Sequence, residues 1–342
     1  MRLFRLEKNE DGETGPVLHT DAEAPDDPGP DEVRVRMRAC SLNYRDILMK
    51  SGASASGGDD PVIPLSDGAG EIEAVGSEVA GFETGDQVAL TFFQDWKGGP
   101  FDMKYHKAAR GGSCDGVLAE TVCVPAHSVV KIPAHLDFAG AACLPCAAVT
   151  AWQGLFERGS GPVTAGQTVL CLGTGGVSIV ALQLAKAAGA RVIVTSSSDE
   201  KLERAQELGA DETINYKTTP DWDKAVFELT EKRGVDHVIE VGGPGTLEKS
   251  MNSVAAGGRI SLIGVLTGFD PPEASLFPLV TRAVDLVGIY VGSRAMFERM
   301  NAFLAEHQIQ PVIDREFEFE DAAAAYEYLE SGSHFGKVVI RV

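Results

Sequence analysis

Basic residues are scarce in this chain of 342 residues, which carries 30 Lys and Arg against 50 Asp and Glu, a formal charge of −20. This balance argues against nucleic acid and anionic membrane surfaces as partners, because both repel an acidic protein. No apolar run approaches the ~20 residues of a transmembrane helix, and the opening residues, MRLFRLEKNEDGETG, lack the apolar core of a signal peptide. We therefore expect a cytoplasmic protein with a small-molecule substrate, whose acidic surface serves solubility.

Cysteine is sparse as well. The six cysteines stand at positions 40, 114, 123, 143, 146 and 171, and only Cys143 and Cys146 form a C-x-x-C pair. Because no second pair follows at the spacing of a zinc ribbon, the sequence excludes that class of metal site. The small apolar neighbours in AACLPCAAV favour buried, inert thiols; a redox-active pair or half of a metal site is the alternative.

The first third of the chain contains short, Val-rich segments bounded by Gly, Pro or Asp, which are typical of strands. They are EVRVRMRACSL (32–42), GEIEAVG (70–76), DQVAL (86–90), AETVCVP (119–125) and SVVKIP (128–133). Such a series predicts a small, strongly curved β-domain rather than a parallel sheet.

The pattern changes at about position 138, where FAGAACLPCAAVTAWQGLFERG (138–159) predicts helices with small residues on their packing faces. Six strand candidates then alternate with helical stretches such as 199–208 and 223–231. The candidates are TVLCLG (168–173), ARVIVTS (190–196), ETINY (212–216), HVIEV (237–241), RISLIG (259–264) and DLVGIYV (285–291). This alternation predicts an α/β fold with a doubly wound parallel sheet covered on both faces. Two further helices (293–307 and 320–331) and a last strand (337–342) follow.

A glycine cluster, Gly173-Thr174-Gly175-Gly176-Val177-Ser178, directly follows the first of these strands and begins a helix. Glycine at 173 permits a tight turn, and glycine at 175 lets the backbone approach a pyrophosphate at the positive end of the helix. Ser178 is small enough for close packing of helix on strand. The helix should bury one face, made of Val177, Val180, Ala181, Leu184, Ala185 and Ala188. The strand, turn and helix together predict a dinucleotide site, with a structural glycine turn as the alternative.

The end of the next strand bears on the choice of cofactor. Sites for NAD usually place an acid there, to accept from the ribose 2′-hydroxyl. Here the strand ends in Thr195, Ser196, Ser197 and Ser198, with Lys201 one turn later. Hydroxyls and an ammonium suit a 2′-phosphate, and Tyr216, at the end of the third strand, could reach the same group. NADP is therefore favoured over NAD; alternatively, the serines only cap the helix and either cofactor binds.

Several segments together resemble the medium-chain dehydrogenase/reductase superfamily, and within it the zinc-independent, quinone-oxidoreductase-like branch. They are SLNYRDILMKSG (41–52), PLSDGAGEIEAVGSEV (64–79), DGVLAETVCVPA (115–126), LPCAAVTAW (144–152), GTGGVSIVALQLAKAAGARVI (173–193) and LGADETINY (208–216). The resemblance implies a β-rich GroES-like domain over 1–146, a Rossmann domain over 147–289 and a return of 290–342 to the first domain. It also implies that cofactor and substrate meet in the cleft between the domains.

The resemblance assigns candidate site residues. Asn43 and Tyr44 would line the nicotinamide end of the site as catalytic candidates, although Tyr44 could instead be a packing aromatic. Asp46 is expected to pair with Arg45 or a neighbour. The other candidates for cofactor binding are Thr150, Gly242, Gly264, Gly292, Arg294 and Lys337. Turn geometry is the alternative for the glycines, and an ordinary surface charge is the alternative for Arg294 and Lys337, which are expected near a phosphate.

The resemblance also argues against zinc. Asn43 stands at the first ligand position of the catalytic-zinc branch, Arg45 at the relay position and Ser66 at the histidine position; only Cys146 matches. One thiolate cannot form a catalytic zinc site with three protein ligands. The four-cysteine lobe of the structural zinc is also missing, because Asp95–Cys114 contains one cysteine.

Without a Lewis acid, a polarised acceptor is easier to reduce than a simple alcohol is to oxidise. We therefore expect an NADPH-dependent reductase of quinones or α,β-unsaturated carbonyls. The alternatives are a zinc-free alcohol dehydrogenase or aldehyde reductase, and a non-catalytic NADPH-binding sensor or structural protein. The apolar strand at 285–291 would lie at the open edge of the sheet, which predicts a homodimer unless later helices cover that edge.

Overall fold

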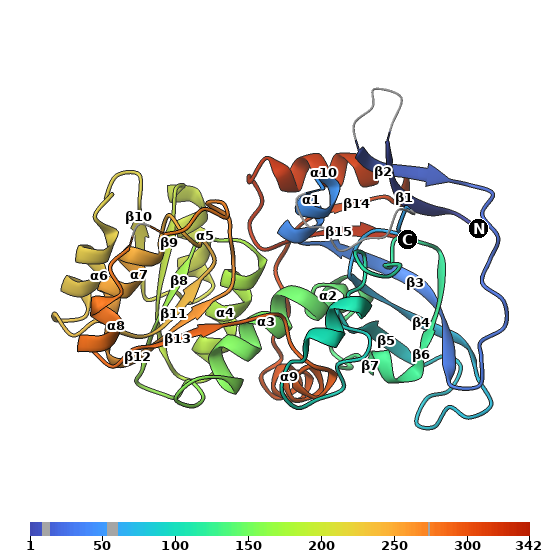
Figure 1. The fold of residues 1–342 in the computed structure, drawn as a ribbon, viewed down its shortest axis with the longest axis horizontal. Helices are drawn as coiled ribbons and strands as arrows, with labels where there is room; N and C mark the ends of the chain where they lie inside the picture. The colour runs from blue at the N-terminus through green and yellow to red at the C-terminus, as the bar shows by residue number, and fades with distance from the viewer. Residues whose placement is uncertain (9–13, 53–60, 273) are drawn as a thin grey trace. The chain divides into compact units, whose positions relative to one another are not determined.

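The computed structural model describes residues 1–8, 14–52, 61–272 and 274–342 (Figure 1). It divides the chain into two compact units: unit 1 comprises residues 1–149 and 292–342, and unit 2 comprises residues 150–291. The boundaries expected after residues 146 and 289 lie three and two residues away from these. No helix among the described residues has both the length and the apolar character needed to cross a membrane.

Unit 1 is built on a curved sheet with the order β14-β15-β3-β4-β5-β7, and β6 pairs with β3. All the pairs are antiparallel except β14 with β15. The strands are β3 (Glu32–Leu42), β4 (Asp67–Val75), β5 (Gln87–Leu90), β6 (Thr121–Pro125), β7 (Val129–Lys131), β14 (Ile313–Phe317) and β15 (Lys337–Arg341). The five strands predicted for the first third are therefore present, and the bounds of β3 agree at both ends. Irregular register between β3 and β4 adds to the bend of this sheet.

The sequence did not predict several elements of unit 1. Among them are the hairpin of β1 (Leu3–Lys8) and β2 (Thr14–His19), the helix α1 (Tyr44–Lys50) and the strand β14. Each is short, and β2 has no fully buried residue, so apolar periodicity is too weak to identify it.

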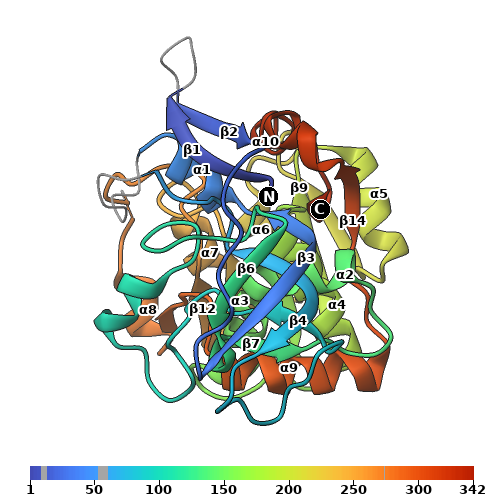
Figure 2. The same ribbon diagram turned by 90° about the vertical axis from the view of Figure 1, so that its right-hand side faces the viewer.

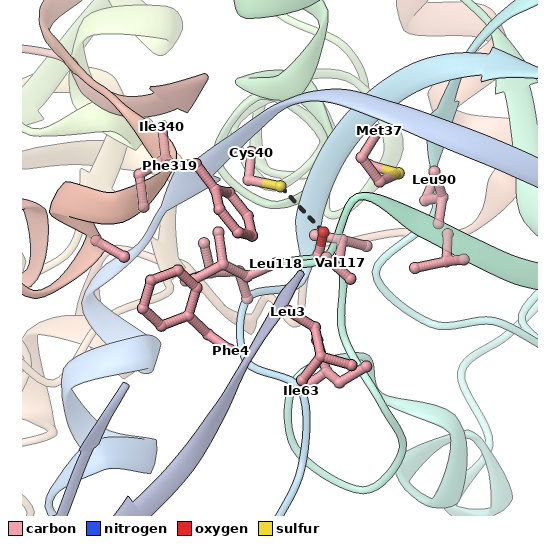
Figure 3. Packing of buried hydrophobic residues seen from close by; sticks show 14 of the residues in the cluster. Leu3, Phe4, Met37, Cys40, Ile63, Leu90, Val117, Leu118, Phe319 and Ile340 are labelled. Atoms are coloured by element: carbon pink, nitrogen blue, oxygen red, sulfur yellow. Dashed lines mark hydrogen bonds between the residues drawn. The ribbon is translucent and has the colours of Figure 1, made fainter. Parts of the chain in front are cut away.

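The core of unit 1 joins the two ends of the chain, both of which lie in this unit (Figure 2). Phe4 packs edge-on against Phe319, with ring centroids 5.1 Å apart. Figure 3 shows these rings beside Leu118 and Ile340, near the hydrogen bond from Cys40 Sγ to the Val117 carbonyl. The C-terminal helices α9 (Arg294–His307) and α10 (Ala322–Glu330) and the strand β15 consequently belong to unit 1.

An aromatic cluster orders the segment in which the four-cysteine lobe is missing. The ring centroids lie 5.4 Å apart for Phe93 and Phe101, 5.2 Å for Trp96 and Phe101, and 5.9 Å for Trp96 and Tyr105. The Trp96 carbonyl in turn accepts the backbone N–H of Arg294, at 2.9 Å, where α9 begins. Ring packing therefore connects this segment to the first turn of α9.

Unit 2 has a six-stranded parallel sheet in the order β10-β9-β8-β11-β12-β13, which is the strand order of a dinucleotide-binding Rossmann fold. The strands are β8 (Thr168–Leu172), β9 (Arg191–Ser196), β10 (Glu212–Asn215), β11 (Val235–Glu240), β12 (Val254–Leu262) and β13 (Asp285–Gly288). All six predicted strands are confirmed, but the bounds of the last two, β12 and β13, need correction. β12 begins five residues earlier than expected, and β13 ends before Ile289.

Helices cover both faces of the unit 2 sheet, with α4 and α5 on one face and α6 and α7 on the other (Figure 1). The helices are α4 (Gly176–Ala187), α5 (Asp199–Glu207), α6 (Trp222–Leu229), α7 (Leu247–Ser253) and α8 (Phe277–Thr281). The predicted face of α4 needs a correction. Val177 and Ala188 are only half-buried, whereas Ile179 and Leu182 are buried as well, because this helix is covered on more than one side.

A buried histidine–arginine pair stabilises the sheet of unit 2. Arg259 is fully buried and donates to the carbonyls of Gly161 (2.9 Å) and Leu155 (3.1 Å) and to His237 Nδ1 (2.9 Å). An arginine can only donate, so Nδ1 accepts and the proton is on Nε2, which lies 3.1 Å from Gln167 Oε1. Burial, with a smaller contribution from Arg259, lowers the pKa of His237 from 6.5 to about 4.

We predict that acid destabilises unit 2 through His237. Because the pKa of His237 is lower in the folded state than in the unfolded state, the free energy of unfolding is highest above pH 6.5, where the imidazole is neutral in both states. This stability is lost as the pH falls from 6.5 towards 4, by about 3 kcal/mol. The urea midpoint of the wild type should fall more steeply over this range than that of His237→Gln. His307→Gln, at an exposed histidine, should behave like the wild type. Equal slopes for the wild type and His237→Gln would contradict the prediction.

Candidate functional site

The glycine cluster forms the turn between β8 and α4, as the sequence indicates. Gly173 has a φ of +75°, a left-handed conformation that favours glycine. Its N–H donates to Thr195 Oγ1 at 3.3 Å, at the end of β9. The Ser178 hydroxyl, at the third position of the motif, donates to the Leu172 carbonyl at 2.6 Å and so connects the first turn of α4 to the end of β8.

Gly175 is the N-cap of α4 and supplies no capping side chain. Thr174 is buried, whereas Gly176 and Val177 begin the helix half-buried. The turn therefore presents backbone N–H groups and the positive end of a twelve-residue helix. This arrangement fits the pyrophosphate of a dinucleotide.

The residues expected around a 2′-phosphate lie at neighbouring strand ends. Ser196 pairs with Asn215 in the ladder between β9 and β10, and the Tyr216 N–H donates to the Ser196 carbonyl at 3.0 Å. Tyr216 is 41% exposed and Ser197 is half-buried. Lys201 lies in the first turn of α5, whose N-cap, Ser198, accepts from the Lys201 N–H at 3.4 Å. Unit 2 thus brings Ser196, Ser197 and Tyr216 together at one edge of the sheet.

The glycines after β11 and β12 have a packing role of their own. A Cβ at Gly264 would lie 2.0 Å from the Val241 carbonyl oxygen, and a Cβ at Gly242 would lie 2.2 Å from Thr246 Oγ1. Glycine at 264 therefore lets its loop pack against the end of β11, and glycine at 242 leaves room for the Thr246 side chain of its own loop.

The buried carboxylate of Glu240 organises these loops and was not among the residues predicted from the sequence. It accepts from the N–H groups of Gly242 (2.8 Å) and Gly243 (3.0 Å), from the Thr246 hydroxyl (2.6 Å) and from the Ser250 hydroxyl. The available signal was a lone acid that ends an apolar strand directly before two glycines.

In unit 1, Lys337 is buried. Its side chain is 3% exposed, so it is not the ordinary surface charge that was its alternative, and the phosphate contact stays a prediction. Its Nζ donates to the Leu42 carbonyl (2.6 Å) and to Asn43 Oδ1 (2.7 Å), and lies 3.8 Å from Asp67 Oδ2. The physical reason is the register of β15 on β3: Val338 pairs with Leu42, which places Lys337 beside Asn43.

Two buried carboxylates adjoin this ammonium. Asp67 is fully buried and accepts from the Ser66 hydroxyl (2.7 Å) and the Cys146 N–H (3.2 Å). Asp46 accepts the Asn43 N–H at 2.7 Å and pairs with Arg45 at 3.6 Å, as the sequence analysis expected. Burial raises the pKa of Asp46 from 3.8 to about 6, against the opposing effect of Arg45.

The remaining candidates lie in different environments. Tyr44 is 40% exposed at the start of α1. Thr150 is buried in α3 (Val149–Trp152), next to the buried Trp152. Arg294 donates to Glu298 Oε1 (2.9 Å) and to the His127 carbonyl (3.3 Å). A Cβ at Gly292 would lie 2.4 Å from Val149 Cγ1, so close packing requires this glycine.

The donor set of unit 1 does not fit a zinc ion. Asn43 and Ser66 offer an amide and a hydroxyl, and burial raises the pKa of the Cys146 thiol far above its usual range. The Lys337 ammonium occupies the same cluster, where it would repel a divalent cation. Throughout the described ranges, no group of three or more His, Cys, Asp or Glu residues could hold a metal ion.

Comparison with known proteins matches both units to described families. Residues 29–134 match the alcohol dehydrogenase GroES-like domain, and residues 176–306 match the zinc-binding dehydrogenase family. A zinc-type alcohol dehydrogenase-like protein of Schizosaccharomyces pombe is 47% identical over 94% of this chain and 93% of its own length. A 2-methylene-furan-3-one reductase of Solanum lycopersicum is 34% identical over 91% of this chain and 71% of its own length.

Solved structures agree with these matches. A putative alcohol dehydrogenase from Sinorhizobium meliloti has a TM-score of 0.90 at 40% identity, with 100% of this chain and 99% of that chain covered. A quinone oxidoreductase from Pseudomonas syringae has a TM-score of 0.80 at 28% identity, with the same coverage. The chain is therefore similar both to proteins named for zinc and to a quinone oxidoreductase.

We predict that the purified protein carries no stoichiometric zinc and that a strong chelator leaves its thermal unfolding midpoint unchanged. Elemental analysis and thermal unfolding of treated and untreated protein measure this directly. A triple variant, Asn43→Cys with Ser66→His and Lys337→Met, restores a Cys/His/Cys donor set and should acquire zinc, which controls for detection. One tightly held zinc per chain in the unaltered protein would contradict the prediction.

Proposed function

This chain belongs to the medium-chain dehydrogenase/reductase superfamily, and on that premise we propose that it is an NADPH-dependent oxidoreductase that reduces quinones or α,β-unsaturated carbonyls without zinc. One observation carries the proposal: the catalytic-zinc positions hold Asn43 and Ser66 around a buried ammonium. Such a site can orient and hydrogen-bond a polarised acceptor, but it offers no Lewis acid to stabilise the alkoxide of a simple alcohol.

The dinucleotide, when bound, supplies the hydride for the reaction. The turn Gly173–Val177 of this chain would hold its pyrophosphate at the N-terminus of α4. The hydroxyls of Ser196 and Ser197, the Tyr216 phenol and the Lys201 ammonium would bind a 2′-phosphate. Because the chain carries a net charge of −20, these local donors must outweigh a repulsive overall field.

Two side chains of unit 1 are the candidates for contact with the acceptor. Asn43 Nδ2 is buried and has no hydrogen-bond partner within the described part of the chain, so it is available as a donor. The exposed Tyr44 phenol follows directly in the chain. Either group could donate to the oxygen that gains charge as an enone or quinone is reduced. The names of the tomato reductase and the Pseudomonas oxidoreductase support this class of acceptor.

A panel of acceptors tests the proposal. NADPH oxidation should be rapid with quinones or enones and slow with simple aldehydes, and secondary alcohols should not reduce NADP⁺ at a comparable rate. Preference for alcohols and aldehydes would favour the alcohol dehydrogenase activity for which several relatives are named. NADPH binding without turnover of any acceptor would favour a non-catalytic role.

We predict that Lys201→Ala weakens NADPH binding about tenfold, the equivalent of about 1.4 kcal/mol, and leaves NADH binding unchanged. The reason is that only NADPH carries the 2′-phosphate. Fluorescence titration of both cofactors measures the change, and Lys224→Ala, at an exposed lysine of α6 paired with Asp221, is the matched control. A wild type that binds NADH as tightly as NADPH, or an equal loss for both cofactors, would reject the assignment.

We also propose that the protein is a homodimer joined through unit 2. β13 is the last strand of the parallel sheet, so one of its edges has no partner strand in the described chain. Large exposed apolar side chains lie in β13 and in the stretch of chain around it, between residues 266 and 290. They are Leu266, Phe269, Leu276, Phe277, Val280, Leu286 and Tyr290. A two-fold axis would pair this edge with its copy and cover these side chains.

The dimer proposal predicts that light scattering gives twice the 36.2 kDa of one chain. Replacing Phe277 and Val280 together by Asp should give monomers, because these side chains are 69% and 77% exposed and would each place a charge in the interface. Met103→Asp, at a side chain of unit 1 that is 72% exposed, should remain dimeric. A monomeric wild type, or a dimeric double variant, would overturn the proposal.

A further inference from the structure

We propose that Lys337 is a positioning residue that holds the Asn43 amide so that Nδ2 points its two N–H groups at the acceptor. This inference rests on the proposed function, because it assigns the ligand of Nδ2 to the reduced substrate. It gives the buried Lys337 a different role from the phosphate contact expected from the sequence.

The chemistry of the ammonium determines the orientation of the amide. A lysine ammonium donates hydrogen bonds and accepts none. At 2.7 Å from Lys337 Nζ, the Asn43 side-chain atom must therefore be Oδ1, and the amide cannot flip without placing N–H against N–H. The opposite side of the amide is then always the donor Nδ2.

The surroundings hold both partners in place. Lys337 Nζ is anchored by the Leu42 carbonyl at 2.6 Å and lies 3.8 Å from the carboxylate of Asp67, which itself accepts from Ser66. The backbone of Asn43 is fixed separately by its N–H bond to Asp46, at 2.7 Å. The side-chain amide is thus held through Oδ1 and the residue that carries it through its backbone N–H, as orienting a reactant requires.

The orphaned donor is the second observation. Nδ2 of Asn43 is buried and has no partner among the described residues. A buried N–H group without a partner costs about 1–3 kcal/mol, and a ligand that accepts from it removes this cost. The carbonyl oxygen of an enone or quinone has the required chemistry, and it accepts more strongly as it gains charge during reduction.

Selective labelling can observe this amide directly, because the chain contains only five asparagines. In protein labelled with [15N]Asn, the Asn43 side-chain signal is identified by its loss in Asn43→Asp. We expect this signal to shift in Lys337→Met, and to shift in the wild type when cyclohex-2-enone is added with NADP⁺, a pair that cannot react. Lys50→Met is the control. Lys50 ends α1, the helix that Asn43 caps, but it pairs with Glu330, so the Asn43 signal should stay unchanged.

A double-mutant cycle provides the kinetic test. Lys337→Met should lower kcat/KM for the enone by about 10- to 100-fold, with NADPH affinity by fluorescence unchanged. If Lys337 acts through Asn43, adding Lys337→Met to Asn43→Ala should cause no further loss. Should Lys337→Met fail to fold because Asp67 loses its cation, Lys337→Met with Asp67→Asn replaces it in both measurements.

The outcomes separate this inference from the proposed function. Additive losses in the cycle, or weaker NADPH binding with an unchanged Asn43 signal, would overturn the positioning role and restore the phosphate contact. An Asn43 signal that does not respond to the enone would overturn the assigned ligand. If the wild type reduces no acceptor of the panel, but the Asn43 signal shifts both in Lys337→Met and when the enone is added to the wild type, the proposed function is rejected and the role of Lys337 is kept.

Discussion

The buried ammonium of Lys337 is the interaction on which unit 1 depends. It lies between the carboxylate of Asp67 and the amide of Asn43, and removing one partner of a buried charge pair typically costs about 3–5 kcal/mol. The last strand of the chain therefore cannot be a dispensable tail. It belongs to unit 1, where its pairing with β3 brings the ammonium to the buried Asp67 of the first third of the chain. The apolar contact of Phe4 with Phe319 reinforces the same closure.

How much of this could be predicted from sequence depends on the range of each interaction. The six parallel strands and the Gly173 turn were predictable because period, turn chemistry and capping act within a few residues. The environment of Lys337 was not, since it is set by a strand register that joins positions 294 residues apart. Glu240 was missed for a different reason: its donors lie only 2 to 10 residues away, but they are backbone N–H groups and hydroxyls whose position depends on how the loop and α7 fold back onto the strand end. At the 2′-phosphate site the predicted residues do lie together, because β9 and β10 are neighbours in the sheet.

The two units illustrate why one fold supports different chemistries. Unit 2 uses backbone geometry, a left-handed glycine and the positive end of a helix, and this combination suits any dinucleotide. Unit 1 uses side chains at strand ends, where single substitutions exchange a thiolate for an amide or an imidazole for a hydroxyl. A name shared across the family therefore describes the scaffold more securely than it describes the metal content of one member. In this chain the amide, the hydroxyl and the ammonium are mutually consistent, because the ammonium compensates Asp67 and leaves no place for a second cation.

The aromatic cluster of Phe93, Trp96, Phe101 and Tyr105 has a consequence for the conditions in which the protein keeps its shape. A segment crosslinked by a metal through thiolates is lost when the metal is scarce or the thiols are oxidised, whereas ring packing is indifferent to both. Apolar contacts, however, weaken on cooling. The segment that contacts the first turn of α9 therefore does not depend on a metal or on reduced thiols, but the ring packing that orders it weakens on cooling.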